Sequence, residues 1–137
     1  FRNEEIRILS LVTRYHRADL PTTQHRRYRN LSSRNRKRVA QLAAILRLAE
    51  GLDRSHFQNV TALRLALEPR TLHIHLETKG DPQVEIWATE SESTLFQKVF
   101  GRTVDVQTTD ILVQLTDEDP PVSFSHATPP SKRRRST

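Results

Sequence analysis

The chain has 137 residues, with 22 Lys and Arg against 16 Asp and Glu, so its formal net charge is +6. It contains no cysteine, which excludes disulfide bonds, a thiolate nucleophile and cysteine-based zinc or iron–sulfur sites. Its three glycines are too few and too scattered for a P-loop or a GxGxxG motif.

The first predicted element is a helix over residues 3–16. Asn3 can cap this helix, and two acidic residues follow in the first turn, where the helix dipole favours negative charge. Apolar residues then recur at helical spacing as far as Tyr15. Pro21 breaks the pattern, so residues 18–32 are expected to form a loop or short turns.

A second helix is expected to begin after a cap at Ser32 or Ser33 and to end near Gly51. From Val39 onward it is apolar over most of its circumference, a pattern typical of a helix at the centre of a helical assembly. We therefore expect it to be the most buried element. Because two helices cannot cover such a surface, the pattern also suggests further helices upstream of Phe1.

The hydrophobic period changes from helical to alternating after Phe57, which indicates strands. We expect two strands over residues 60–67 and 72–76, joined by a hairpin turn at 68–70. A helix over 81–101, a third strand over 104–106 and a possible fourth strand over 111–113 follow. Asp81 and Pro82 form a helix start, and Gly101 ends that helix. The prediction is an α+β chain whose small β-β-α-β unit has an antiparallel sheet covered by its helix on one face.

Charge divides the chain into parts. Residues 1–56 hold 13 basic and 5 acidic residues, a net +8, whereas residues 57–106 hold 5 basic and 7 acidic residues, a net −2. We predict a helical domain over 1–56, a small α/β domain over 57–116 and a disordered, Pro-rich tail with a basic end over 117–137. No apolar run approaches the roughly 20 residues that cross a bilayer, so no membrane span is expected.

The main candidate site is a cationic set in the helical part. Arginine dominates it, and the planar guanidinium matches phosphate oxygens in a bidentate way that lysine cannot. We expect a polyanion such as inorganic polyphosphate or nucleic acid to bind there, although the same pattern also fits a solvated surface without a ligand. The set consists of Arg14, His16, Arg17, Arg26, Arg27 and Arg29. No catalytic residue is assigned.

Two weaker candidates involve possible metal ligands. His73 and His75 lie on one face of a predicted strand, as zinc ligands sometimes do, but only Glu77 is available as a third ligand, and two surface histidines are the simpler interpretation. Asp53 follows the buried helix and can act as a metal ligand, pair with Arg54 or cap backbone amides.

Four segments resemble one family. The string LAAILRLAEGLDRSH over residues 42–56 is similar to the C-terminal region of the exopolyphosphatase/guanosine pentaphosphate phosphatase (Ppx/GppA) family. Residues 12–17, 84–88 and 95–101 resemble neighbouring segments of the same family, and their order and spacing agree over about residues 1–106. The resemblance implies a helical domain related to HD phosphohydrolases followed by a small α/β domain.

The resemblance also implies a function. Family members hydrolyse terminal phosphate from inorganic polyphosphate or guanosine pentaphosphate in a separate, actin-like module, so this chain would contribute polyanion binding and homodimerisation in a cytoplasmic enzyme. The family uses a divalent metal, Mg or Mn, and Asp53 matches the final aspartate of the HD pattern, whose histidines would precede Phe1. Two alternatives are a stand-alone basic nucleic-acid-binding module and a metal-dependent HD hydrolase acting alone.

Overall fold

The computed structural model describes residues 2–108. In chain order, these residues form two helices, a long helix, a hairpin, two short helices and a final strand. Their bounds are α1 Asn3–Tyr15, α2 Arg26–Arg29, α3 Ser33–Leu52, β1 Val60–Leu67, β2 Thr71–Thr78, α4 Gln83–Ser91, α5 Thr94–Phe100 and β3 Thr103–Thr108.

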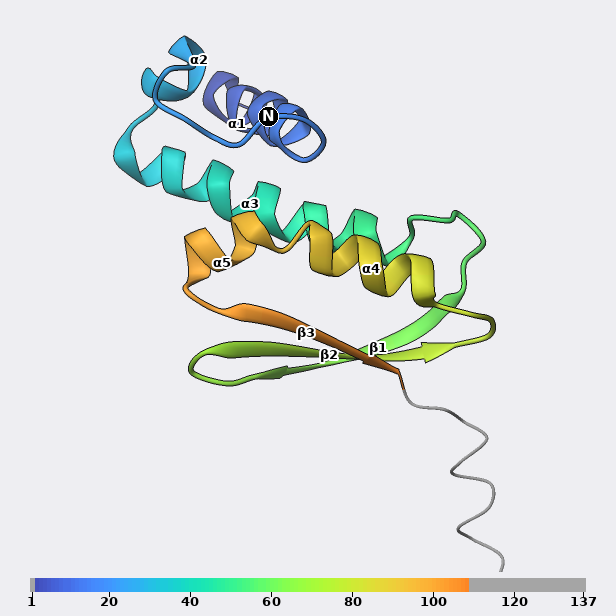
Figure 1. The fold of residues 1–137 in the computed structure, drawn as a ribbon. Coiled ribbons are helices and arrows are strands. Elements are labelled where there is room, and N and C mark those ends of the chain that lie inside the picture. The colour runs from blue at the N-terminus through green and yellow to red at the C-terminus, as the bar shows by residue number, and fades with distance from the viewer. Residues whose placement is uncertain (1, 109–137) are drawn as a thin grey trace, which may run out of the picture.

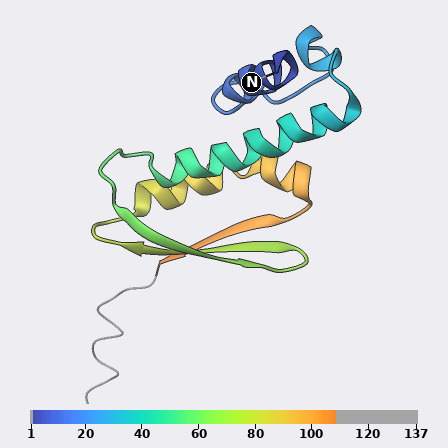
Figure 2. The same ribbon diagram turned by 180° about the vertical axis from the view of Figure 1, so that it is seen from behind.

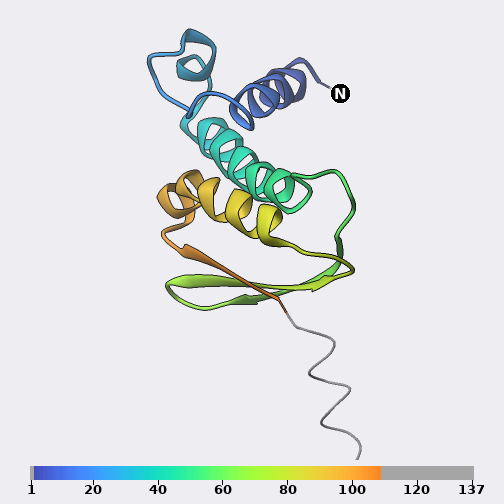
Figure 3. The same cartoon turned by 45° about the vertical axis from the view of Figure 1, so that its right-hand side comes forward.

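The elements are stacked in layers, with the sheet at one side of the molecule (Figure 1). Helices α4 and α5 cover one face of the sheet, α3 runs alongside them on the side away from the sheet, and α1 and α2 lie beyond α3 (Figures 1 and 3). The opposite face of the sheet carries no other described element (Figure 2). The α+β fold class predicted from the sequence is confirmed.

The first helices begin close to the predicted positions. Helix α1 is capped by Arg2 rather than Asn3, and the Arg2 backbone N–H donates to Glu5 Oε2 at 2.9 Å. Helix α3 is capped by Ser32, whose hydroxyl accepts the backbone N–H of Asn35 at 3.3 Å. The loop predicted over residues 18–32 contains the one-turn helix α2.

Helix α3 is central but is not buried on all sides. It contacts α1, α4 and α5, and its buried positions include Val39, Ala43, Ala44 and Leu48. Leu42, Ile45 and Leu46 are 46%, 52% and 37% exposed, so they form an uncovered apolar flank. The expectation of burial around the helix was therefore too strong: the described part of the chain covers two sides of α3 and leaves a third open.

The sheet has the order β1-β2-β3 and is mixed. Strands β1 and β2 form the predicted antiparallel hairpin, closed by the bond from the Glu68 N–H to the Thr71 carbonyl at 2.9 Å. Strand β3 pairs with β2 in parallel, which corrects the prediction of an antiparallel sheet. The cause is the connection: α4 and α5 carry the chain back along the sheet, so β3 runs in the same direction as β2.

The helix predicted over residues 81–101 is interrupted. It forms α4 and α5, with Asp81 Oδ1 accepting the Gln83 N–H at 3.1 Å at the start. Gly101 ends α5 in the left-handed conformation, with φ 67°, as its position predicted. Val84 and Trp87 of α4 are 51% and 69% exposed, whereas Leu95 and Phe96 of α5 are buried in the core.

One continuous hydrophobic core joins the helices to the sheet, because residues of α1, α3, α5, β2 and β3 belong to the same buried cluster. The division into domains at residues 56 and 57, and the relation of the helical part to HD phosphohydrolases, stay predictions. The possible fourth strand over 111–113 and the tail over 117–137 lie outside the described residues. Within residues 2–108, no helix combines the length and apolar character needed to cross a bilayer.

Candidate functional site

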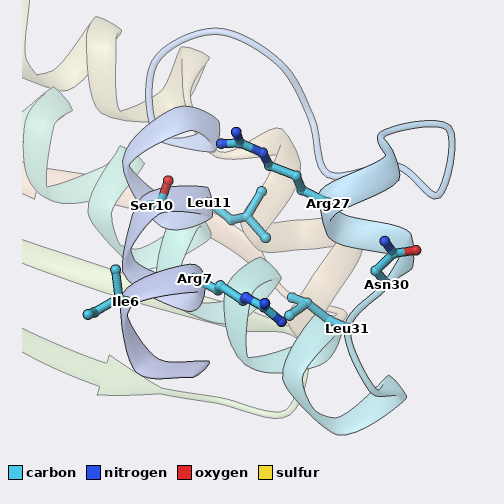
Figure 4. A pocket seen from close by; sticks show the side chains of 7 residues that line it. All are labelled: Ile6, Arg7, Ser10, Leu11, Arg27, Asn30 and Leu31. Atoms are coloured by element: carbon cyan, nitrogen blue, oxygen red, sulfur yellow. The ribbon is translucent and has the colours of Figure 1, made fainter. Parts of the chain in front are cut away.

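Two surface hollows contain four of the predicted site residues, namely His16, Arg17, Arg27 and Asp53. The first hollow, of about 470 Å³, lies between α1 and α2 (Figure 4). It is lined by Arg7, Ser10 and Leu11 at positions i, i+3 and i+4 of α1, by Ile6 of the same helix, and by Arg27, Asn30 and Leu31 from the segment that contains α2. We call it the α1–α2 hollow.

Apolar and cationic groups are segregated in the α1–α2 hollow. Leu11 and Leu31 are 4% and 8% exposed and form an apolar base. Arg27 extends from α2 towards α1, and Arg7 extends from α1 towards Leu31, so both guanidinium groups reach the gap between the helices (Figure 4). No carboxylate lines the hollow, and Arg7 and Arg27 form no ion pair within residues 2–108.

Aromatic packing fixes the position of α2 against α1. The Tyr15 hydroxyl and His25 Nδ1 share a hydrogen bond of 2.8 Å, the two rings are stacked, and Tyr28 meets the Tyr15 ring edge-on. The Tyr28 hydroxyl donates to the Arg36 carbonyl at 3.2 Å. Burial raises the pKa of both tyrosines, so they stay protonated at neutral pH. These rings therefore hold the segment that contains α2 against α1, and Tyr15 is wholly buried and unable to stack on a base.

The second hollow, of about 640 Å³, lies where the C-terminal ends of α1 and α3 approach α4. We call it the mixed-charge hollow, because both basic and acidic side chains line it. Its polar lining comprises His16, Arg17, Glu50, Asp53, Arg54, His56 and Glu92, and its apolar lining comprises Leu46 and Ala49.

The cations of the mixed-charge hollow already have acidic partners. His16 Nε2 and Arg17 Nε lie 3.3 and 3.2 Å from Glu50 Oε1. Arg54 NH2 lies 3.3 Å from Glu92 Oε1. These carboxylates offset the positive charge that an incoming polyanion would need, so this hollow is the weaker anion site of the two.

Asp53 lies at the rim of the mixed-charge hollow and is exposed. Its Oδ2 is 3.4 Å from His56 Nδ1. Within residues 2–108, no group of three or more His, Asp or Glu side chains is placed to hold a metal ion. The described residues therefore do not fit a divalent metal site around Asp53, and its role as a ligand stays a prediction.

The predicted cationic set is divided between these regions. Arg27 lines the α1–α2 hollow, whereas His16 and Arg17 line the mixed-charge hollow. Arg26 and Arg29 are exposed on α2, and Arg14 NH2 pairs with Asp19 Oδ2 at 3.2 Å. Arg7 lies outside the predicted set, although its spacing of four residues from Leu11 indicates that both lie on one helix face.

Arg47 is a further residue outside the predicted set, and it lies in an otherwise apolar stretch of α3. It is 8% exposed, and its guanidinium holds the end of α1 onto α3. It donates to the Tyr15 carbonyl at 2.8 Å, the Asp19 carbonyl at 3.1 Å and Glu92 Oε2 at 3.0 Å. One side chain thus joins three segments that border the mixed-charge hollow.

The pair of histidines on β2 lies on the open face of the sheet. His73 Nδ1 is 2.9 Å from Asp105 Oδ2 on β3, and His73 Nε2 is 3.4 Å from Glu68 Oε2. The hydrogen bond to Asp105, aided by Glu68, raises the pKa of His73. His75 stacks against His73 at 6.4 Å between ring centroids. Both ring nitrogens of His73 have carboxylate partners. This arrangement supports a role for His73 in ion pairs more than the zinc site considered from the sequence.

Comparison with known families gives one match. A family model described as Ppx/GppA phosphatase, domain III, matches residues 1–91, which include α1, α2, α3, the hairpin and all of α4. No curated protein matches the chain.

Proposed function

The chain belongs to the Ppx/GppA phosphatase family, and on this premise we propose that it binds the anionic phosphate chain of the substrate in an exopolyphosphatase-type hydrolase. The proposed overall reaction is removal of terminal phosphate from inorganic polyphosphate or guanosine pentaphosphate in the cytoplasm. In this proposal the chain supplies substrate contacts, and hydrolysis with Mg or Mn takes place elsewhere in the enzyme. We expect residues 1–137 alone to release no orthophosphate.

The observation that carries the proposal is the pair Arg7 and Arg27 in the α1–α2 hollow. Their guanidinium groups come from two different helices and meet no carboxylate among the residues that line the hollow. Ser10 and Asn30 also line the hollow. Phosphate oxygens accept paired N–H groups from guanidinium, so this hollow offers contacts that fit a phosphate group.

The neighbouring cations extend this surface. Arg26 and Arg29 are exposed on the same short helix as Arg27, and a linear polyanion that enters the hollow can continue along them. Arg14, His16 and Arg17 remain in the proposal only as secondary contacts, because each has an acidic partner that a polyanion would have to displace.

The test is the salt dependence of polyphosphate binding, measured by isothermal titration calorimetry on the 137-residue chain. For a linear polyanion, the slope of log K against log salt changes by roughly 0.7–0.9 for each phosphate contact that is lost. We expect the double variant Arg7→Gln/Arg27→Gln to bind more weakly and to lower the slope by roughly 1.5.

The matched control is Lys79→Gln/Lys98→Gln, which removes the same charge from the sheet half of the molecule. An unchanged slope in the arginine variant, or an equal decrease in the control, would remove the α1–α2 hollow from the proposed site. Competition with single-stranded RNA at fixed salt tests the alternative of a nucleic-acid-binding module. Base-dependent RNA affinity that polyphosphate does not displace would favour that alternative.

A further inference from the structure

One side of α1 joins the two hollows. Arg7, Arg14 and Arg17 are spaced at i, i+7 and i+10, so they lie on one side of the helix, which we call its cationic face. The C-cap His16 keeps helical backbone angles, φ −77° and ψ −20°, so Arg17 continues this face. Arg7 lines the α1–α2 hollow and Arg17 lines the mixed-charge hollow, and at the rise of an α-helix they are about 15 Å apart. A linear polyanion held in the α1–α2 hollow therefore meets Arg17 only if it extends along the whole face.

Glu50 occupies the far end of the cationic face. It lies in the last turn of α3, and its Oε1 is 3.2 Å from Arg17 Nε and 3.3 Å from His16 Nε2, so one carboxylate oxygen contacts both side chains. The Glu50 side chain is 30% exposed, whereas that of Arg17 is 74% exposed. The carboxylate thus takes an N–H group of Arg17 that a phosphate oxygen would otherwise accept. Glu50 therefore competes with any anion that reaches this end of α1.

The two ends of the cationic face differ in what an incoming anion must displace. Arg7 and Arg27 form no ion pair within residues 2–108, so a phosphate group that enters the α1–α2 hollow displaces no carboxylate. At Arg17 the phosphate must first displace Glu50. The ion pair is largely exposed on its arginine side, and pairs of this kind typically change an equilibrium by about two- to fivefold. The cost is small enough for a polyanion to overcome and large enough to measure.

We propose that Glu50 is a specificity-determining residue that limits the advantage of long phosphate chains over short ones. A short anion such as tripolyphosphate spans about one turn of helix, so it contacts Arg7 and Arg27 and does not reach Arg17. A long chain extends along the cationic face, and its affinity is lowered because Glu50 holds Arg17. Neutralising Glu50 therefore strengthens the binding of long chains only. This inference rests on the function proposed for the α1–α2 hollow.

The test is isothermal titration calorimetry of the full 137-residue chain with two probes, tripolyphosphate and a long-chain inorganic polyphosphate. We expect Glu50→Gln to bind the long chain about two- to fivefold more tightly than the unaltered chain does, and to bind tripolyphosphate equally well. The matched control is Glu90→Gln, which removes the same charge from an exposed position of α4 that forms no ion pair within residues 2–108. This control should change neither affinity. In a Glu50→Gln/Arg17→Gln variant most of the gain should disappear, because the freed guanidinium is absent.

The sign of the change separates this role from a purely structural one. If Glu50 only held the end of α1 on α3, Glu50→Gln would loosen the site and weaken the binding of both probes. Such weakening, an unchanged affinity for the long chain, or an equal gain for tripolyphosphate would overturn the proposal. Arg17→Gln gives a second readout, with weaker binding of the long chain only; circular dichroism checks that each variant folds, and an unchanged affinity here would also overturn the proposal. Failure of the proposed function looks different, because Arg7→Gln/Arg27→Gln would then leave both affinities unchanged.

Discussion

Replacing Arg47 by methionine should destabilise the chain more than the loss of either arginine that lines the mixed-charge hollow, Arg17 or Arg54. Methionine keeps the aliphatic bulk of the side chain but removes every hydrogen bond of the guanidinium. The Tyr15 and Asp19 carbonyls and one oxygen of Glu92 then lose their donor. Leaving the partners of a buried ion pair without their counterpart typically costs about 3–5 kcal/mol.

The structure places Arg47→Met at the lower end of that range, at about 3 kcal/mol. The reason is that the Glu92 side chain is 25% exposed and keeps its contact with Arg54. For a chain of this size the loss corresponds to a decrease of about 10 °C in Tm. Arg47→Lys should recover only part of it, since one ammonium cannot reach all three acceptors.

The assay is urea denaturation followed by circular dichroism at neutral pH, with Arg54→Met as the matched control. Arg54 binds the same carboxylate, but its side chain is 43% exposed, so its removal should cost less than about 1 kcal/mol. If Arg47→Met costs no more than Arg54→Met, Arg47 does not hold α1 onto α3 in the way described.

Two further predictions concern other contacts. Gly51→Ala should lower the free energy of unfolding by about 1–3 kcal/mol in thermal melts, because the added Cβ would lie 2.6 Å from Thr89 Cα on α4. The control is Gly80→Ala, where an added Cβ meets only the Asn59 side chain. An equal decrease in both variants would contradict the close contact between α3 and α4. His73→Gln should flatten the pH dependence of the urea midpoint. Because the pKa of His73 is raised in the folded state, its pairing with Asp105 stabilises the fold fully below about pH 6.5, and this stabilisation is lost as the pH rises through the folded pKa. Parallel pH profiles for the unaltered chain and His73→Gln would contradict this role.

The sequence by itself determined the local structure of this protein, because local structure depends on neighbours within a few residues. The cap at Ser32 or Ser33, the turn at 68–70 and the stop at Gly101 each follow from the local preferences of these residues, and the structure confirms all three, with Ser32 as the cap. The change from helical to alternating period likewise predicted the helix α3 and the hairpin β1–β2.

Only the tertiary structure decided which of these elements meet and what their polar side chains do. The direction of β3, the open flank of α3 and the exposure of Trp87 depend on how helices return over the sheet, which periodicity does not encode. Arg27 was selected from the sequence because it lies in a basic run, whereas Arg7 became its counterpart only through the packing of α2 on α1. Arg47 shows the same limit most clearly: a charged residue within an apolar helix has no partner in the sequence pattern, since its acceptors lie about 30 and 45 residues away and are brought together only by folding.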